Sequence, residues 1–157
     1  MHLLSIFHWI QDTSLSDSLR KSDHLVGAAF GVFHVIGLIL LLSALLLISL
    51  RLLGLGLRQQ PVRQLTRSLS PLFWTGLAIL VFSGTITFMP SAVFYYNNPA
   101  LWIKAVLLLL AILVQVSLFR KITQLDEPGP ILAKTTALLT LSLWFGVGLA
   151  GRAIGYL

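Results

Sequence analysis

The run from His24 to Leu53 constrains this chain more than any other part of its sequence. The run is apolar almost throughout, and it is longer than the roughly 20 residues that a helix needs to cross a bilayer. It nevertheless carries His34 well inside, roughly 15 Å along a helix from His24. An ionisable side chain at such a depth is costly and marks a functional site by default. We therefore predict a membrane-spanning helix with a candidate site at His34.

Glycines border this histidine on the predicted helix. Gly31 lies three residues before His34, Gly37 lies three residues after it, and Gly27 extends the strip as Gly27-x-x-x-Gly31. Small residues there leave room either for a flat, bulky group such as haem or for the backbone of a neighbouring helix. Both interpretations are open from the sequence.

Composition places the chain among integral membrane proteins. Of its 157 residues, 57% are hydrophobic and only 10% are charged, which is too little charge for the surface of a soluble domain. We predict an all-α, multi-pass membrane protein that forms a single domain over residues 1–157. The expected spans cover residues 24–53, 70–89, 100–119 and 131–155, with Ser70 as the N-cap of the second span and Pro71 in its first turn. The four spans form an up-down helix bundle.

The first 22 residues are too short and too polar to span. Leu3, Leu4, Phe7 and Ile10 share one side at helical spacing, which predicts a short helix lying against the membrane interface. A break at residues 13–17 precedes a second helical turn at 18–21.

The net charge of +6 is explained by topology. The basic residues gather in the connections after the first and third spans, which indicates that these connections are cytoplasmic and that both termini are outside. This distribution argues against binding to nucleic acid. The residues concerned are Arg51, Arg58, Arg63, Arg67, Arg120 and Lys121.

Two further cations fall inside predicted spans. With this topology, Lys104 and Arg152 share the outer half of the membrane with His34, Ser83 and Gly84. Each cation could snorkel to the lipid headgroups. No Asp or Glu lies inside a span to neutralise them, so an inward-pointing cation would need an anionic partner that is not protein. A haem propionate, a lipid phosphate or a quinone oxygen would serve.

Haem is one candidate ligand of His34. The absence of cysteine excludes covalent c-type haem and leaves b-type haem. A second axial ligand would come from His24, His8, Met89 or a symmetry-related histidine of a homo-oligomer. His24 and His34 lie about 280° apart around the helix, so they cannot clamp one iron from opposite sides. Alternatively, His34 is a neutral imidazole that hydrogen-bonds to a serine, threonine or carbonyl across the bundle, or it takes part in protonation or quinone chemistry.

The segments SLSDSLRKSD, HVIGLILLLSALLLISLRLLGLG, NPALWIKAVLLLL and AGRAIGY carry a resemblance that covers nearly the whole chain. The chain resembles a family of small uncharacterised bacterial inner-membrane proteins, which is similar in turn to copper-resistance D-type proteins and four-helix b-type cytochromes. The most distinctive elements are His34 with Gly37, Lys104 and the Ala150-Gly151-Arg152 run. The resemblance implies a four-helix membrane fold in the bacterial inner membrane, and it implies haem.

Two functional hypotheses follow. In the first, an oligomeric haem b protein passes electrons between quinol and a periplasmic partner. His34 is then the axial ligand, Gly27, Gly31 and Gly37 make room for the ring, and Lys104 and Arg152 hold the propionates. In the second, the bundle is an assembly or anchor subunit, or a carrier of a small solute or metal ion, and His34 is a packing residue. No motif for bond-making catalysis is present, so an accessory or electron-transfer role is favoured over an enzyme.

Overall fold

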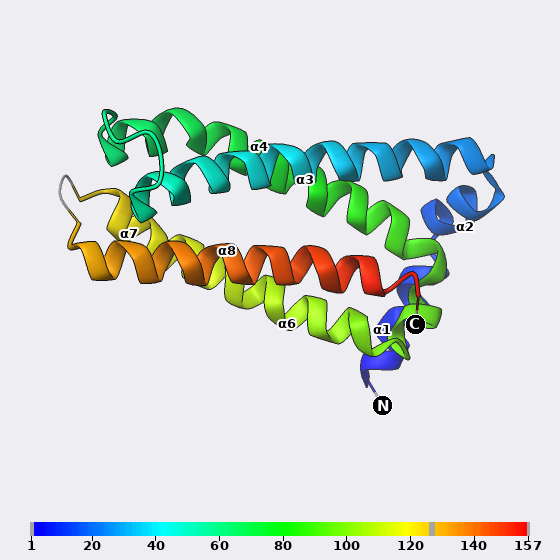
Figure 1. Ribbon diagram of the computed structural model, residues 1–157. Helices are drawn as coiled ribbons and strands as arrows, with labels where there is room; N and C mark the ends of the chain where they lie inside the picture. The colour runs from blue at the N-terminus through cyan, green and yellow to red at the C-terminus, as the bar shows by residue number, and fades with distance from the viewer. Residues whose placement is uncertain (1, 126–127, 157) are drawn as a thin grey trace.

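The computed structural model describes residues 2–125 and 128–156, and this part of the chain is helical without a strand (Figure 1). The long helices are α3 (His24–Leu53), α4 (Val62–Phe88), α6 (Pro99–Val114) and α8 (Pro130–Ala153). A π-helical turn, η2 (Gln115–Phe119), joins α6 to α7 (Arg120–Thr123). The short elements are α1 (His2–Gln11), α2 (Ser14–Lys21), η1 (Met89–Ser91) and α5 (Ala92–Tyr96).

Four stretches of the described chain are long and apolar enough to cross a membrane, as the sequence predicts. They are His24–Leu53, Val62–Tyr96, Pro99–Thr123 and Pro130–Ala153. Large apolar side chains cover their outward faces, for example Val106, Leu109 and Leu113 on α6, each more than half exposed. Such a surface suits a hydrocarbon solvent and not water.

The four long helices run alternately in opposite directions (Figure 1). We call the end where α3 begins and α8 finishes the terminal end, and the opposite end the basic end. α3 packs against α4 and α8, and α6 packs against α8. The core lies toward the basic end and includes Leu41, Leu45, Ile48, Phe73, Phe119, Ala137 and Trp144.

The first three turns of α3 stand apart from this core. All the buried residues of α3 lie at or beyond Gly37, whereas residues 24–36 are exposed or half-buried. α3 and α8 are farther apart at the terminal end than in the core (Figure 1). The bundle is therefore tight in its basic half and open in its terminal half.

The start of the second long helix differs from the prediction. We expected Ser70 to cap it and Pro71 to lie in its first turn, but α4 begins at Val62 and Pro71 lies inside it. Val62 and Leu65 are buried, so the segment before the proline packs one apolar face against the bundle although its other face is polar. This burial compensates for the backbone hydrogen bond that Pro71 cannot make.

The short N-terminal helices pack across the terminal end, where α1 lies crosswise to the long helices (Figure 1). Phe7 is buried in an aromatic cluster, with ring centroids 5.6 Å from Phe88 and 5.1 Å from Tyr96. The side-chain oxygen of Gln11 accepts a hydrogen bond from the Val93 amide at 2.9 Å. The predicted helix over residues 2–11 is confirmed.

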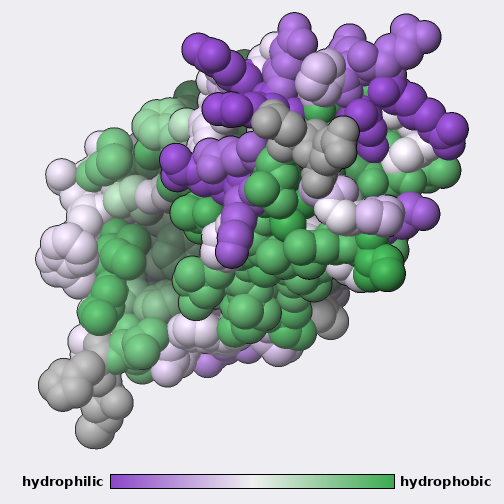
Figure 2. All heavy atoms as spheres, turned by 90° about the vertical axis from the view of Figure 1, so that its left-hand side faces the viewer, coloured by the Kyte–Doolittle hydropathy of each residue, from purple (hydrophilic) through white to green (hydrophobic). Residues whose placement is uncertain are grey.

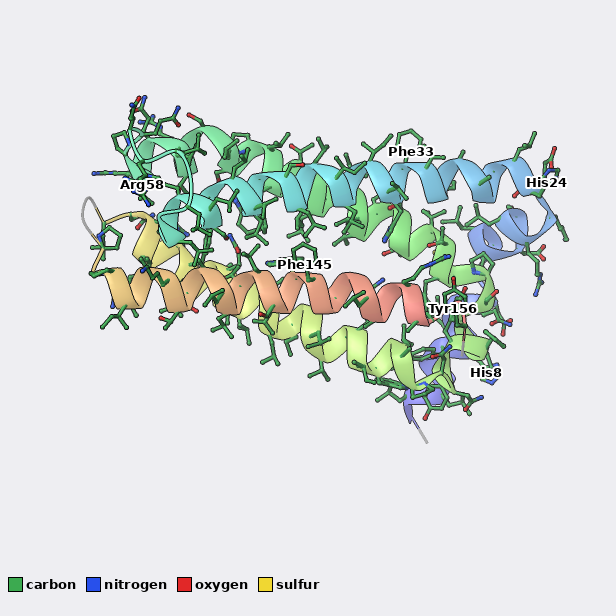
Figure 3. The ribbon with its side chains drawn as sticks, viewed as in Figure 1. His8, His24, Phe33, Arg58, Phe145 and Tyr156 are labelled. Carbon is green, nitrogen blue, oxygen red and sulfur yellow. The ribbon has the colours of Figure 1, made fainter. Side chains whose placement is uncertain are left out.

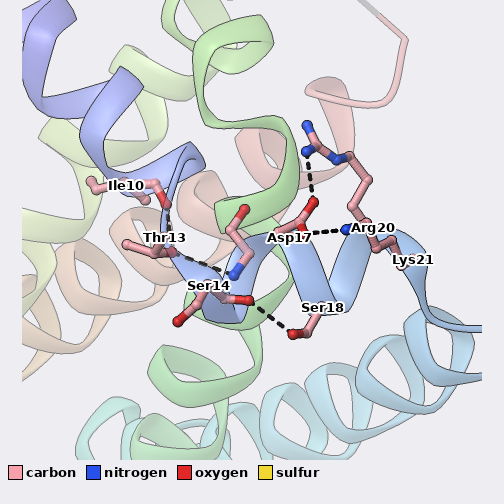
Figure 4. Close-up of polar contacts among 8 residues, drawn as sticks. Ile10, Thr13, Ser14, Asp17, Ser18, Arg20 and Lys21 are labelled. Carbon is pink, nitrogen blue, oxygen red and sulfur yellow. Dashed lines mark hydrogen bonds and ion pairs between the residues drawn. The ribbon is translucent and has the colours of Figure 1, made fainter.

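The second short helix begins earlier than predicted, at Ser14 instead of residue 18. Thr13 is its N-cap, since its hydroxyl oxygen accepts a hydrogen bond from the Ser16 amide (Figure 4). The carboxylate of Asp17 accepts hydrogen bonds from Arg20 and Lys21 one turn later. The hydrogen bond from Lys21, followed by that from Arg20, holds the pKa of Asp17 below its ordinary value of 3.8.

The basic end carries most of the positive charge. Figure 2 looks at this end and shows hydrophilic residues gathered over part of it, next to an apolar surface. Arg51 and Arg58 fasten the connection after α3 by donating to the carbonyls of Gln60 and Gly54, respectively. The connections after α3 and α7 therefore lie together, opposite the chain termini (Figure 1).

Candidate functional site

His34 makes a polar contact across the α3–α4 interface. Its Nδ1 lies 2.9 Å from Oγ of Ser83, which is fully buried in α4. The histidine itself is half-buried. The expectation that His34 hydrogen-bonds to a hydroxyl of a neighbouring helix is thus confirmed, and the partner is Ser83.

The backbone of α4 approaches this site closely because two glycines face each other. A Cβ added to Gly37 would lie 2.9 Å from the carbonyl oxygen of Gly76, and one added to Gly76 would lie 2.7 Å from that of Gly37. About two turns along α4 toward the terminal end, a Cβ at Gly84 would lie 3.3 Å from Cε1 of His34. Gly37 therefore serves helix packing, and its expected role of making room for a cofactor is wrong because α4 fills that room.

Gly27 and Gly31 differ from Gly37. A Cβ added to either would meet nothing within 4 Å, so both border open space in the described structure. On a helix they share the strip of His34, and α8 lies farther from α3 at that end of the bundle (Figure 1). The expected role of these two glycines, which is to make room for a bulky group beside the histidine, stays a prediction.

Lys104 reaches the same layer of the bundle from α6. Its side chain lies over Gly151 of α8, where an added Cβ would be 3.3 Å from Nζ. The described residues offer its ammonium no carboxylate within ion-pair distance. Two contacts between helices thus lie in the terminal half of the bundle: His34 of α3 contacts Ser83 and Gly84 of α4, and Lys104 of α6 contacts Gly151 of α8.

The other histidines expected as second ligands do not join His34. His24 is highly exposed at the start of α3, and its Nδ1 lies 2.6 Å from a carboxylate oxygen of Asp23. His8 is exposed on α1 (Figure 3). Among the residues described, no group of three or more His, Cys, Asp or Glu is placed to hold a metal ion. Neither His8 nor His24 therefore faces a common centre with His34 in the described part of the chain.

Arg152 also lies outside the site. Its Nη2 donates a hydrogen bond to the Tyr156 hydroxyl at 2.8 Å, and the guanidinium carbon lies 5.0 Å from the centroid of that ring. The side chain is exposed at the end of α8. Arg152 and Lys104 therefore have different surroundings, although Lys104 lies against Gly151, the residue before Arg152.

The arrangement offers one imidazole and one uncompensated cation in apolar surroundings, next to open space. This pair can hold an electron-pair acceptor, such as an iron, together with an anionic group. Sequence reasoning placed Ser83 and Gly84 at the correct depth without assigning them to the site. Their depth, which matches that of His34, is the signal that identifies them.

Fold and site together define a small all-helical protein with four helices of membrane-spanning length and a polar site in one half. The chain belongs to a family of unknown function, DUF6644, whose model matches residues 6–157. No curated protein and no solved structure matches the chain. Function must therefore be inferred from the site itself.

Proposed function

We propose that this protein is a membrane-embedded haem b protein that passes electrons between quinol and a periplasmic partner. The observation that carries the proposal is that His34 and Lys104 both lie in the terminal half of the bundle, where Gly27 and Gly31 border open space and the described residues offer Lys104 no carboxylate partner. The resemblance to copper-resistance D-type proteins and four-helix b-type cytochromes points the same way.

The residues present fit one side of a haem. His34 would supply an axial nitrogen, Gly27 and Gly31 would border the ring, and Lys104 would neutralise a propionate. Haem iron supplies reversible one-electron transfer when it is bound. The protein contributes the ligand, the apolar surroundings and the positive charge, and these determine the reduction potential.

The second axial ligand is proposed to come from a second copy of the chain. His8 and His24 are exposed and lie on surfaces separate from that of His34. The terminal half of α3 is accessible around most of its circumference, so a neighbouring subunit can approach His34 there. Met89 in η1 is the alternative ligand within one chain.

The proposed setting is the bacterial inner membrane, with the four long helices spanning it and both termini on the periplasmic side. The separation of the basic end from the terminal end supports this orientation by the positive-inside rule (Figure 2). The α1 helix, crosswise over the terminal end, would then lie at the periplasmic interface, with lipids around the bundle. The His34 site would open toward that side.

The test is the visible spectrum of detergent-purified protein, oxidised and dithionite-reduced, with a pyridine haemochrome assay. We expect a Soret band that shifts on reduction in the wild type and is lost in H34A. The matched controls H8A and H24A should keep it, because both side chains are exposed and remote from His34. A colourless wild type, expressed with sufficient haem, would refute the haem function.

One observation favours a second candidate. The hydrogen bond from His34 to Ser83 is what a polar packing residue would make, and the Gly37–Gly76 contact is a helix-packing device. A colourless protein in which H34A only lowers stability would support a non-enzymatic bundle that acts as an anchor or carrier.

A further inference from the structure

The Ser83 hydroxyl has one hydrogen but makes two short polar contacts. Its Oγ lies 2.6 Å from the carbonyl oxygen of Ile79, one turn earlier in α4, and 2.9 Å from Nδ1 of His34. The carbonyl of Leu80 is farther away, at 3.5 Å. A serine hydroxyl donates one hydrogen bond and accepts up to two, so it can donate to only one of these neighbours.

The Ile79 contact decides where that hydrogen lies. Two oxygens 2.6 Å apart are within the usual range of an O–H···O hydrogen bond, and without a hydrogen between them their lone pairs would repel. A carbonyl oxygen has no hydrogen to offer, so the Ser83 hydroxyl donates to Ile79. The Ser83 oxygen can then only accept from His34, and Nδ1 must carry the hydrogen.

We infer that Ser83 is a positioning residue that holds neutral His34 as the Nδ1–H tautomer and leaves the lone pair on Nε2. Gly84 supports this geometry, because the edge of the imidazole lies where a side chain would otherwise begin. Thr87 does not compete for the hydroxyl, since its own Oγ1 lies within hydrogen-bonding distance of two backbone carbonyls, those of Ser83 at 3.0 Å and Gly84 at 3.1 Å.

This inference deepens the proposed function, and its consequence for iron binding rests on that function. Histidines that bind metals generally donate the hydrogen of their other nitrogen to a protein acceptor, which orients the ring and raises the basicity of the ligating nitrogen. Ser83 is such an acceptor for His34. Nε2 is then the nitrogen available to iron.

The first test reads the tautomer directly, without haem. Protein labelled with ¹⁵N-histidine is studied by NMR in detergent micelles at about pH 8.5, where imidazoles are neutral at the ordinary pKa of about 6.5. The spectrum of H34A identifies the His34 signals among the four histidines. We expect a protonated-type shift for Nδ1 and an unprotonated-type shift for Nε2 in the wild type.

The variant S83A should move these signals toward the Nε2–H form or toward a mixture. The matched control S49A should leave them unchanged, because Ser49 is equally buried, lies on α3 and makes no contact with His34. A wild type with Nε2–H, or an S83A spectrum identical to that of the wild type, would overturn the inference.

The second test separates this inference from the proposed function. If the wild type binds haem, S83A should retain a Soret band but shift the midpoint potential, whereas S49A should shift neither. An unchanged potential in S83A would overturn the positioning role. A colourless wild type with the Nδ1–H tautomer would instead refute the haem function and leave the tautomer assignment intact.

Discussion

Replacing Gly76 by alanine should weaken the bundle at the point where α3 and α4 lie closest. The new Cβ would lie 2.7 Å from two backbone atoms of α3, the Gly37 carbonyl oxygen and the Leu41 amide nitrogen. Neither atom belongs to a flexible side chain that could turn away. The two helices must therefore separate before the substitution can be accommodated.

The required displacement follows from the geometry. An ordinary Cβ contact begins at 3.4 Å, so α4 must withdraw by about 0.7 Å at this point. A gap of that size forfeits a quarter to a half of the dispersion attraction between the atoms on either side. Overpacking of this kind costs about 1–3 kcal/mol. Withdrawal by the same amount would also lengthen the 2.9 Å hydrogen bond between His34 and Ser83 beyond hydrogen-bonding distance.

The assay is reversible unfolding of the detergent-solubilised protein by increasing SDS, followed by far-ultraviolet circular dichroism. G37A should lose stability like G76A, because its Cβ would meet the same interface from the other side. G27A and G31A are the matched controls, since a Cβ there meets nothing within 4 Å, and they should unfold at least as late as the wild type. If G76A and G37A unfold together with G27A and G31A, the close helix crossing deduced here is refuted.

Three other perturbations have definite expected outcomes. K104M should raise the SDS midpoint of the haem-free protein, by an amount that corresponds to about 1 kcal/mol of unfolding free energy, because it removes a cation that lacks a counter-ion in the described structure. The same variant should weaken haem retention in a pyridine haemochrome assay. N98A should lower the SDS midpoint by about 1–2 kcal/mol, since Asn98 caps α6 and its Nδ2 donates to the carbonyl of Ile154 at 3.2 Å. The hydrogen bond from Lys21 lowers the pKa of Asp17, so the stability that this carboxylate contributes is present above pH 3.8 and is lost as the pH falls through the lowered pKa of the folded state. NMR titration of the Asp17 carboxyl carbon measures this pKa. An ordinary pKa would contradict the contact with Lys21.

The four long helices could be predicted from the sequence because hydropathy is a local property. Each span needs a long apolar run, and the runs are interrupted by proline, glycine and charge. The start of α4 was predicted wrongly because Arg63, Arg67 and Pro71 suggest a loop at the same local level. The apolar positions Val62, Leu65 and Leu69, which continue the helical spacing through this polar stretch, were the signal that the helix begins earlier.

The candidate site was predicted only in part, and the missing part is not local. The depth of His34 in an apolar run was sufficient to single it out, and Lys104 followed from the alternating direction of the spans. Ser83 as its partner depends on the register and rotation of α4 against α3. That register is set by the contact between Gly37 and Gly76, and the sequence does not show which residue of α4 faces Gly37.

The tight and open halves of the bundle are two consequences of one crossing. Gly37 and Gly76 bring α3 and α4 together, and beyond this point toward the terminal end the helices diverge. His34 lies one turn past the crossing, close enough to reach Ser83 and far enough to border the space beside Gly31 and Gly27. Gly37, about one turn nearer the basic end, is buried, and Gly27, about two turns nearer the terminal end, is exposed. The crossing therefore decides which residue of α3 can be both positioned by the protein and accessible to a ligand.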